Sequence, residues 1–199
     1  MRNVSRPGVL PVLLALAVGC DRSGGRAPER GSASSAPRAE TPAVASAAPA
    51  GAWTVDDTGI GPVRTGMTVA QADSVLGGAL RVAGDPPASC TYASAAGSPP
   101  GVRFMVVDGR IARVDVDSAS VATASGARVG DAEERVAALY RGRVRVTPHK
   151  YEPGGHYLEV TLAGAAGGDH RTIFETDGHR VTRFRVGKLP EVEWVEGCS

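Results

Sequence analysis

The stretch that decides the expected fold is VRFMVVDGRIARVDV, residues Val102–Val116, and RTIFETDGHRVTRFRV, residues Arg171–Val186, repeats its plan. Each stretch has an Asp-Gly pair between two runs rich in Val, Ile and Phe. An Asp-Gly pair in that setting is a strong signal for a β-hairpin. The sequence therefore predicts two hairpins, which turn at Asp108-Gly109 and at Asp177-Gly178.

A short helix is expected upstream of each hairpin. Residues 66–77 read GMTVAQADSVLG, in which Thr68 and Gln71 have the spacing of a capping box. Residues 130–142 read GDAEERVAALYRG, in which Asp131 and Glu134 have the same spacing. Apolar side chains recur at helical intervals in both segments, and each ends in a glycine that suits a C-terminal turn.

Between helix and hairpin, further strands are predicted at 88–93, at 143–147 and at 157–162. The helical segments begin 64 residues apart, and a two-copy repeat of this length favours an internal duplication over a solenoid. The predicted fold is α+β, with two tandem units of one helix plus a three- to four-stranded antiparallel sheet. Side by side, these units would make one long curved sheet with both helices on its convex side. Copy one would span about 54–117, copy two about 126–187, and residues 188–199 would form a C-terminal tail.

The N-terminal residues have the order of a secretory signal peptide, residues 1–19. Arg2 and Arg6 precede an apolar run over Val9–Val18, and Gly19 stands before Cys20. That run is shorter than the roughly 20 residues that a membrane-spanning helix needs. Residues 20–51 are mainly Ala, Ser, Pro and Gly without an aromatic residue, so we expect a disordered tether ahead of a globular domain over 52–199.

Leu16–Cys20 resembles a bacterial lipobox, with Ala17 where leucine is commonest. The resemblance implies cleavage before Cys20 and attachment of acyl chains, palmitate among them, to that cysteine. Two or three acyl chains anchor a protein to a bilayer. We therefore expect a lipid-anchored protein of the bacterial cell envelope that faces the periplasm or the exterior, while the choice between inner and outer membrane stays open.

Lipidation of Cys20 accounts for one of three cysteines and leaves Cys90 and Cys198. In an oxidising compartment two remaining thiols of one small domain favour a disulfide, and two buried free thiols are the alternative. The disulfide would close a long loop of the chain.

The composition limits the core and the partners. With 5% aromatic residues, 26 glycines and 14 prolines, we expect a core of Val, Leu, Ile and Ala in short strands joined by turns. Loss of Arg2 and Arg6 with the signal peptide would leave 20 basic against 21 acidic side chains. A charge this close to zero gives no electrostatic case for binding nucleic acid.

Residues 59–68, GIGPVRTGMT, with the helix that follows, resemble the opening of the repeat in outer-membrane assembly lipoproteins of the SmpA/OmlA type and in the tandem-repeat β-lactamase inhibitor protein. The resemblance covers about 54–187 and implies a protein-binding or scaffold role on a concave sheet surface. The chain lacks that inhibitor's cysteine in each repeat and its aromatic-rich binding face, so inhibition of a β-lactamase is not expected.

Four histidines of the second copy are the candidates for chemistry: His149, His156, His170 and His179. Zinc would need three protein ligands and an open position, and two of these histidines with Glu152 or Asp169 would supply them. Their spacings match no compact zinc motif, and exposed loop histidines are the simpler interpretation. No catalytic residue, resident metal or cofactor is predicted.

The candidate binding surface consists of Arg143, Arg145, Tyr151 and Tyr157. In an extended strand Arg141, Arg143 and Arg145 would share one face, where Glu159 or Glu175 would neutralise them. Arginine and aromatic residues dominate binding hot spots, and Trp194 is a further candidate. We therefore predict an envelope-tethered lipoprotein with a protein-binding or structural role, whose partner is an envelope protein or a cell-wall component. The alternatives are a metal-dependent hydrolase that uses the His149/His156 region and a module that binds cell-wall glycans.

Overall fold

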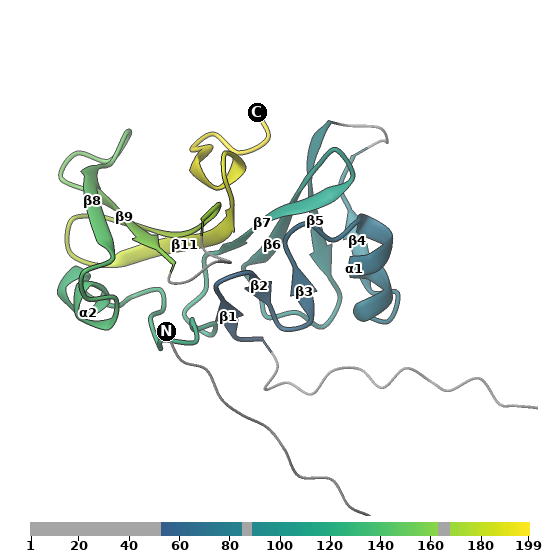
Figure 1. Ribbon diagram of the computed structural model, residues 1–199, viewed down its shortest axis with the longest axis horizontal. Helices are drawn as coiled ribbons and strands as arrows, with labels where there is room; N and C mark the ends of the chain where they lie inside the picture. The colour runs from purple at the N-terminus through teal and green to yellow at the C-terminus, as the bar shows by residue number, and fades with distance from the viewer. Residues whose placement is uncertain (1–52, 85–88, 163–167) are drawn as a thin grey trace, which may run out of the picture. The chain divides into compact units, whose positions relative to one another are not determined.

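Eight strands form one antiparallel sheet in the computed structural model, which describes residues 53–84, 89–162 and 168–199. All of these residues belong to one unit, residues 43–199. The strand order is β4-β5-β6-β7-β11-β10-β9-β8, so the two halves of the sheet meet at the β7–β11 pair (Figure 1). The strands are β4 (Leu80–Val82), β5 (Cys90–Ala95), β6 (Val102–Val107), β7 (Arg110–Val116), β8 (Val144–Pro148), β9 (His156–Thr161), β10 (His170–Thr176) and β11 (Val181–Lys188).

Smaller elements lie on both sides of this sheet. Three two-residue strands form a separate meander: β1 (Val55–Asp56), β2 (Gly59–Ile60) and β3 (Val63–Arg64). The helices α1 (Val69–Val75) and α2 (Glu133–Leu139) lie on the same side of the large sheet as the meander (Figure 1). The 3-10 turn η2 (Glu191–Glu193) lies on the opposite side, against β7, β10 and β11.

Both predicted hairpins are confirmed, although their turns are built differently. Asp108 and Gly109 have φ angles of 47° and 72°, which is the left-handed pair that a two-residue turn between twisted strands requires. In the second hairpin the Asp177 carboxylate accepts hydrogen bonds from the backbone N–H groups of His179 and Arg180, at 2.9 and 2.7 Å. Each hairpin also contains a register shift one or two residues before its turn.

The two helices begin differently. At α1 the predicted capping box is confirmed, because the Thr68 hydroxyl accepts from the Gln71 N–H while the Gln71 side chain accepts from the Thr68 N–H. At α2 the predicted box is wrong. The N-cap is Ala132, and the Asp131 carboxylate instead accepts from the Arg128 N–H and pairs with Arg135.

The predicted fold class is wrong. The described residues are mostly β, with one eight-stranded and one three-stranded antiparallel sheet and two α-helices of seven residues each, in place of two α+β helix-plus-sheet units. The physical reason is that each helical segment forms a helix of only seven residues, while the strands pair into one continuous sheet. Its two halves are joined where β7 pairs with β11, from Phe184 opposite Val116 to Gly187 opposite Arg113. Pairing these strands removes two exposed edges that separate units would leave open.

The hydrophobic core lies on the helix side of the sheet. Val116, Phe184, Phe174 and Leu158 face one another in turn across β7, β11, β10 and β9, and all four are at most 1% exposed. Tyr140 of α2 packs on Phe174, with ring centroids 5.8 Å apart. Of the helices in the described part of the chain, none is both long and apolar enough to cross a membrane. The predicted signal peptide, Cys20 and the tether lie outside the described residues.

Candidate functional site: a charged sheet face beneath the C-terminal segment

The face opposite the core carries charged side chains in rows that follow the strand register. The first row crosses six adjacent strands and consists of Arg103, Asp115, Arg185, Ile173, Glu159 and Arg145. The second crosses four strands and consists of Arg183, Glu175, Tyr157 and Thr147. We call these two rows, together with Tyr92 and Arg113, the charged face. It arises because side chains of a strand alternate between the two sides of the sheet.

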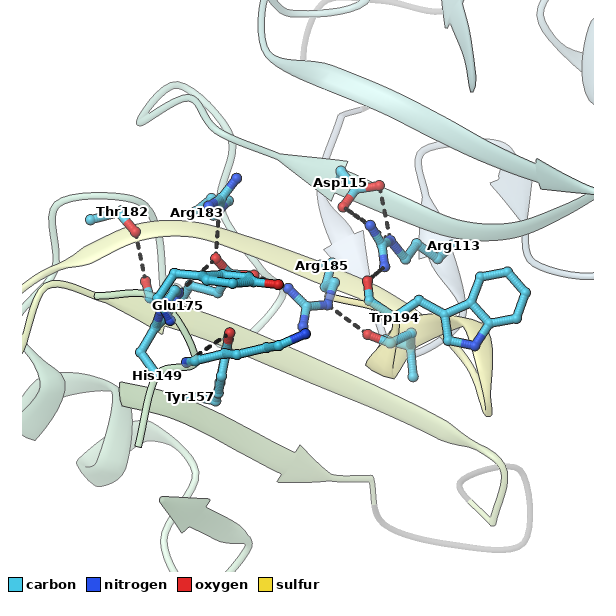
Figure 2. A network of polar contacts seen from close by, with 12 residues as sticks. Arg113, Asp115, His149, Tyr157, Glu175, Thr182, Arg183, Arg185 and Trp194 are labelled. Carbon is cyan, nitrogen blue, oxygen red and sulfur yellow. Dashed lines mark hydrogen bonds and ion pairs between the residues drawn. The ribbon is translucent and has the colours of Figure 1, made fainter. Parts of the chain in front are cut away.

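Arg113 is a fully bonded cation within this face, and its side chain is only 4% exposed. Its Nε donates to both oxygens of Asp115, at 3.0 and 3.1 Å, and its Nη2 donates to the Tyr92 hydroxyl at 3.1 Å. Its Nη1 donates to the carbonyls of Glu191 and Trp194, at 3.1 and 2.6 Å (Figure 2). Gly187 lies opposite Arg113, where a Cβ atom would stand 2.5 Å from the Arg113 Cβ. Any larger residue at position 187 would therefore clash with Arg113.

Glu175 is the anionic centre of the other half of the face, and its side chain is 4% exposed. Arg185 Nη1 and Arg183 Nε donate to its two oxygens, the latter at 2.6 Å, and His149 Nε2 lies 3.3 Å from it (Figure 2). Burial raises the pKa of Glu175, but Arg185, Arg183 and the His149 contact together outweigh burial and hold the pKa below its usual range. Glu175 is therefore a carboxylate at neutral pH.

The hydrogen bonds of His149 determine its tautomer. Its Nδ1 accepts from the backbone N–H groups of Tyr151 and Glu152, at 3.1 and 3.0 Å, so Nε2 carries the ring proton that points at Glu175. The ring stacks on Tyr157, with centroids 4.4 Å apart. His149 thus links the loop after β8 to Glu175 through hydrogen bonds at both ring nitrogens.

The C-terminal segment, residues 189–199, covers the middle of the charged face. A disulfide joins Cys90 of β5 to Cys198, as predicted, with the Cα atoms 5.3 Å apart. The Val192 carbonyl accepts a 2.6 Å hydrogen bond from Arg185 Nε, so this arginine, like Arg113, is bonded to main-chain oxygens of the segment. At Gly197, φ is 68° and a Cβ atom would stand 2.6 Å from the Tyr92 hydroxyl oxygen, so only glycine fits this approach.

Two hollows share Arg185 and Val195. The first, the Tyr157 hollow, has a volume of about 150 Å³ and is also lined by Arg145, Thr147, Tyr157, Glu159, Ile173 and Glu193. The second, the Tyr92 hollow, has a volume of about 220 Å³ and is also lined by Tyr92, Arg103, Arg113, Asp115, Glu175, Arg183, Glu196 and Gly197. Both open on the charged face beside the C-terminal segment.

The structure brings together only part of the predicted binding surface. Arg145 and Tyr157 both line the Tyr157 hollow, and Arg145 pairs with Glu159, as the sequence suggested. Arg143 precedes the first residue of β8, and its guanidinium lies 5.5 Å from the ring centroid of Tyr140. Tyr151 lies in the loop after β8, 57% exposed, with the Lys150 ammonium over its ring. Arg143 and Arg145 line a shared hollow, but Arg141 and Arg143 precede β8, so the three arginines do not lie within one strand as expected.

The histidines do not converge on a common site. His149 contacts Glu175 of the charged face, whereas His156 lies 2.9 Å from Glu133 in the first turn of α2, on the core side. His170 contacts Thr65 and Asp169, at 2.8 and 2.7 Å. Within residues 53–84, 89–162 and 168–199 no three His, Cys, Asp or Glu side chains lie close enough together to hold a metal ion.

The central residues of the charged face were not among the residues predicted for the site. They are Tyr92, Arg103, Arg113, Asp115, Arg183 and Arg185. For four of them a signal was present, since Arg113 and Asp115, like Arg183 and Arg185, stand two positions apart in the quoted hairpins and must share a sheet face. No local signal places the C-terminal segment over them.

Comparison with known proteins assigns no family. No family model matches the chain, and a search of curated proteins found no match. Among solved structures, the uncharacterized protein yfeY from Escherichia coli aligns with 68% of this chain and 99% of that chain, at 14% sequence identity and a TM-score of 0.43. That similarity is too low to carry an argument about function. The relationship to the SmpA/OmlA-type repeat stays a prediction.

Proposed function

We propose that this protein is an envelope lipoprotein, anchored through Cys20, that binds a protein partner with its charged sheet face. The observation that carries the proposal is the arrangement of that face. Its arginines are fixed by bonds to Asp115, Glu175 and the C-terminal segment, and its aromatic rings Tyr92 and Tyr157 are held by Arg113 and His149. Fixed arginine and aromatic side chains are the residues that contribute most to protein interfaces.

The energetics of the face also support a binding role. Buried ion pairs such as Arg185–Glu175 contribute little to stability, because the cost of removing both charges from water offsets their attraction. An apolar face under the same C-terminal segment would hold the fold at least as well. The exposed arginines Arg145 and Arg183 are the charges that a partner can contact, and the buried charges Glu159 and Glu175 fix their positions.

The proposed location rests on three features of the chain. The N-terminal order of residues 1–19 and the Leu16–Cys20 segment resemble a lipoprotein signal, and residues 20–51 would let the domain reach about 30 Å from the bilayer. The Cys90–Cys198 disulfide is the kind of bond that oxidising compartments favour. The resemblance of residues 59–68 to the repeat of envelope lipoproteins agrees with the same location.

The test is affinity capture of the full chain from its native envelope, with Cys20→Ala as the control for tethering. An Arg145→Glu/Arg183→Glu variant would reverse two exposed charges of the face, while Arg128→Glu/Arg141→Glu reverses two exposed charges away from it. We expect a specific protein to be captured by the parent chain and by the Arg128/Arg141 variant only. Equal capture by all charge variants, or no partner with the parent chain, would contradict the proposal.

A further inference from the structure

The Tyr92 hollow has an interior of buried ion pairs and a rim of two half-exposed arginines that keep unused N–H groups. Inside, Arg113 bonds to Asp115 and Arg185 bonds to Glu175, and all four side chains are at most 15% exposed. At the rim, Arg103 and Arg183 are 50% and 56% exposed. The interior pairs therefore form a fixed floor, and the rim arginines face water.

Both rim arginines keep N–H groups that no described residue accepts. Arg183 uses its Nε for Glu175, and its Nη1 and Nη2 have no acceptor among the described residues. Arg103 has one distant contact, 3.8 Å from its Nη2 to Asp117, and its guanidinium lies 5.4 Å from the ring centroid of Tyr92. A guanidinium with an unused edge is the donor that binds a carboxylate with two parallel hydrogen bonds.

Tyr92 adds a neutral donor at the same place. Its hydroxyl oxygen accepts from Arg113 Nη2, so the hydroxyl proton must point elsewhere, and within the described residues it has no acceptor. Burial raises the pKa of Tyr92, and the negative charge of Asp115 raises it further, so the phenol stays protonated at neutral pH. The hollow thus combines two guanidinium groups and one hydroxyl as unused donors.

The charge balance sets the kind of anion that fits. Four arginines and three carboxylates line the hollow. With two neighbours, Lys150 at 2.7 Å from Glu196 and Asp117 at 3.8 Å from Arg103, the total is five cations and four carboxylates. The small positive excess suits a single negative charge, whereas a dianion such as phosphate would meet stronger repulsion from Asp115 and Glu175 in the floor.

We propose that the Tyr92 hollow is a binding site for one carboxylate of a peptide, held by Arg103 and Arg183 and by the Tyr92 hydroxyl. The inference rests on the proposed protein-binding function and names the chemical group that the charged face recognises. The carboxylate has two sources in a protein partner, the end of its chain or an acidic side chain.

The experiment is an NMR titration of the ¹⁵N-labelled full chain in a non-ionic detergent, observed at the arginine Nε–H signals. The probes are N-acetyl-alanyl-alanine for a chain end, N-acetyl-aspartate N-methylamide for a side chain, the C-terminal amide of the dipeptide as the uncharged control, and inorganic phosphate. We expect one of the two carboxylate probes to shift the Arg103 and Arg183 signals saturably, and the amide to leave them unchanged.

Variants locate the site. Arg103→Gln and Arg183→Gln should each weaken binding of the carboxylate probe about tenfold or more, because each removes a charge-assisted hydrogen bond. Tyr92→Phe should weaken it by a smaller factor, since it removes a neutral donor. Arg128→Gln, which removes an exposed arginine elsewhere, should bind as the parent chain does.

Three results would overturn the site: no saturable shift with either carboxylate probe, equal affinity for the amide, or tighter binding of phosphate than of both carboxylates. Affinity unchanged in both rim variants would do the same. Capture of a partner by the parent chain and its loss in the Arg145/Arg183 variant would, in that case, leave the broader function standing without this site.

Discussion

The middle of each face of the eight-stranded sheet is covered, but by different means. On one face Phe104, Phe174 and Phe184 are at most 1% exposed beneath the helices and the meander. On the other, Arg113 and Arg185 are 4% exposed and bond to the C-terminal segment, and Glu175 is 3% exposed among Arg183, Arg185 and His149. Apolar burial has no directional requirement, whereas each buried charge needs partners in defined positions. The comparison shows that a short segment can bury arginine side chains when its main-chain carbonyl groups accept their hydrogen bonds.

The largest effect should follow from releasing the C-terminal segment. Cys90→Ser/Cys198→Ser opens a loop whose ends are 108 residues apart, and the chain-entropy model gives about 4.7 kcal/mol for a loop of about that length. We expect the free energy of unfolding, measured with urea, to fall by about 4 kcal/mol. The parent chain under reducing conditions is the matched control and should fall equally. A loss below about 1 kcal/mol would mean that the carbonyl–arginine bonds alone hold the segment.

A cavity in the apolar face should lower the free energy of unfolding by nearly as much. Phe174→Ala removes a ring that contacts both Tyr140 and Phe184, with centroids 5.8 and 5.3 Å away. We expect a loss of about 3–5 kcal/mol in the same urea measurement. Val75→Ala, at a position that is 44% exposed, is the control and should change stability by less than about 1 kcal/mol. Similar losses for the two variants would refute the assignment of the core to this face.

Removing one charge from the charged face tests whether burial of its partner depends on the ion pair. Glu175→Gln keeps the shape of the side chain but leaves Arg185 buried without its counter-charge. We expect a loss of about 3 kcal/mol. Replacing both partners, in Glu175→Gln/Arg185→Met, should recover much of it, because the uncompensated cation is then gone. A double variant less stable than the single one would show instead that the arginine contributes through its packing.

The pH dependence of stability should reflect the same carboxylate. The pKa of Glu175 lies below its ordinary value of 4.5 in the folded protein, so its ionised form favours folding. That contribution is complete above the pKa of the unfolded chain and is lost as the pH falls through the folded pKa. We expect Glu175→Gln to flatten the acid limb of the stability curve between about pH 5 and pH 3. An unchanged acid limb would indicate that the surface carboxylates Asp169 and Asp177, whose pKa values are also lowered, dominate it.

The hairpins were predictable because their signals are local. An Asp-Gly pair and alternate apolar residues lie within sixteen positions, and the structure confirms both the strands and the turns. The strand order of the sheet could not be predicted in this way. Pairing of β7 with β11 joins residues about 70 positions apart, and no property of either strand alone selects its neighbour. The disulfide was predictable by counting cysteines, since only two remain after Cys20.

The sequence predicts which residues share the charged face, but it does not predict that they are buried. Alternation puts Arg113 and Asp115 on one side of a strand, yet their burial depends on carbonyls of Glu191 and Trp194, about 80 residues away. A main-chain carbonyl leaves no mark on the sequence, because every residue carries one. The three arginines expected in one strand do not lie within it for a related reason, since β8 begins at Val144 and leaves Arg143 to stack on Tyr140.

The smallest effect on stability should come from the rim of the charged face. Arg183→Gln removes a cation that is 56% exposed, and Glu175 keeps its bonds to Arg185 and His149. We expect the free energy of unfolding to change by less than about 1 kcal/mol, as for other exposed ion pairs. The same variant should weaken binding of the carboxylate probe about tenfold, so stability and recognition would separate at one residue. A loss of about 3 kcal/mol, similar to that of Glu175→Gln, would instead show that Arg183 stabilises the fold as the buried ion pairs do. Arg183 would then not be a rim residue available for binding.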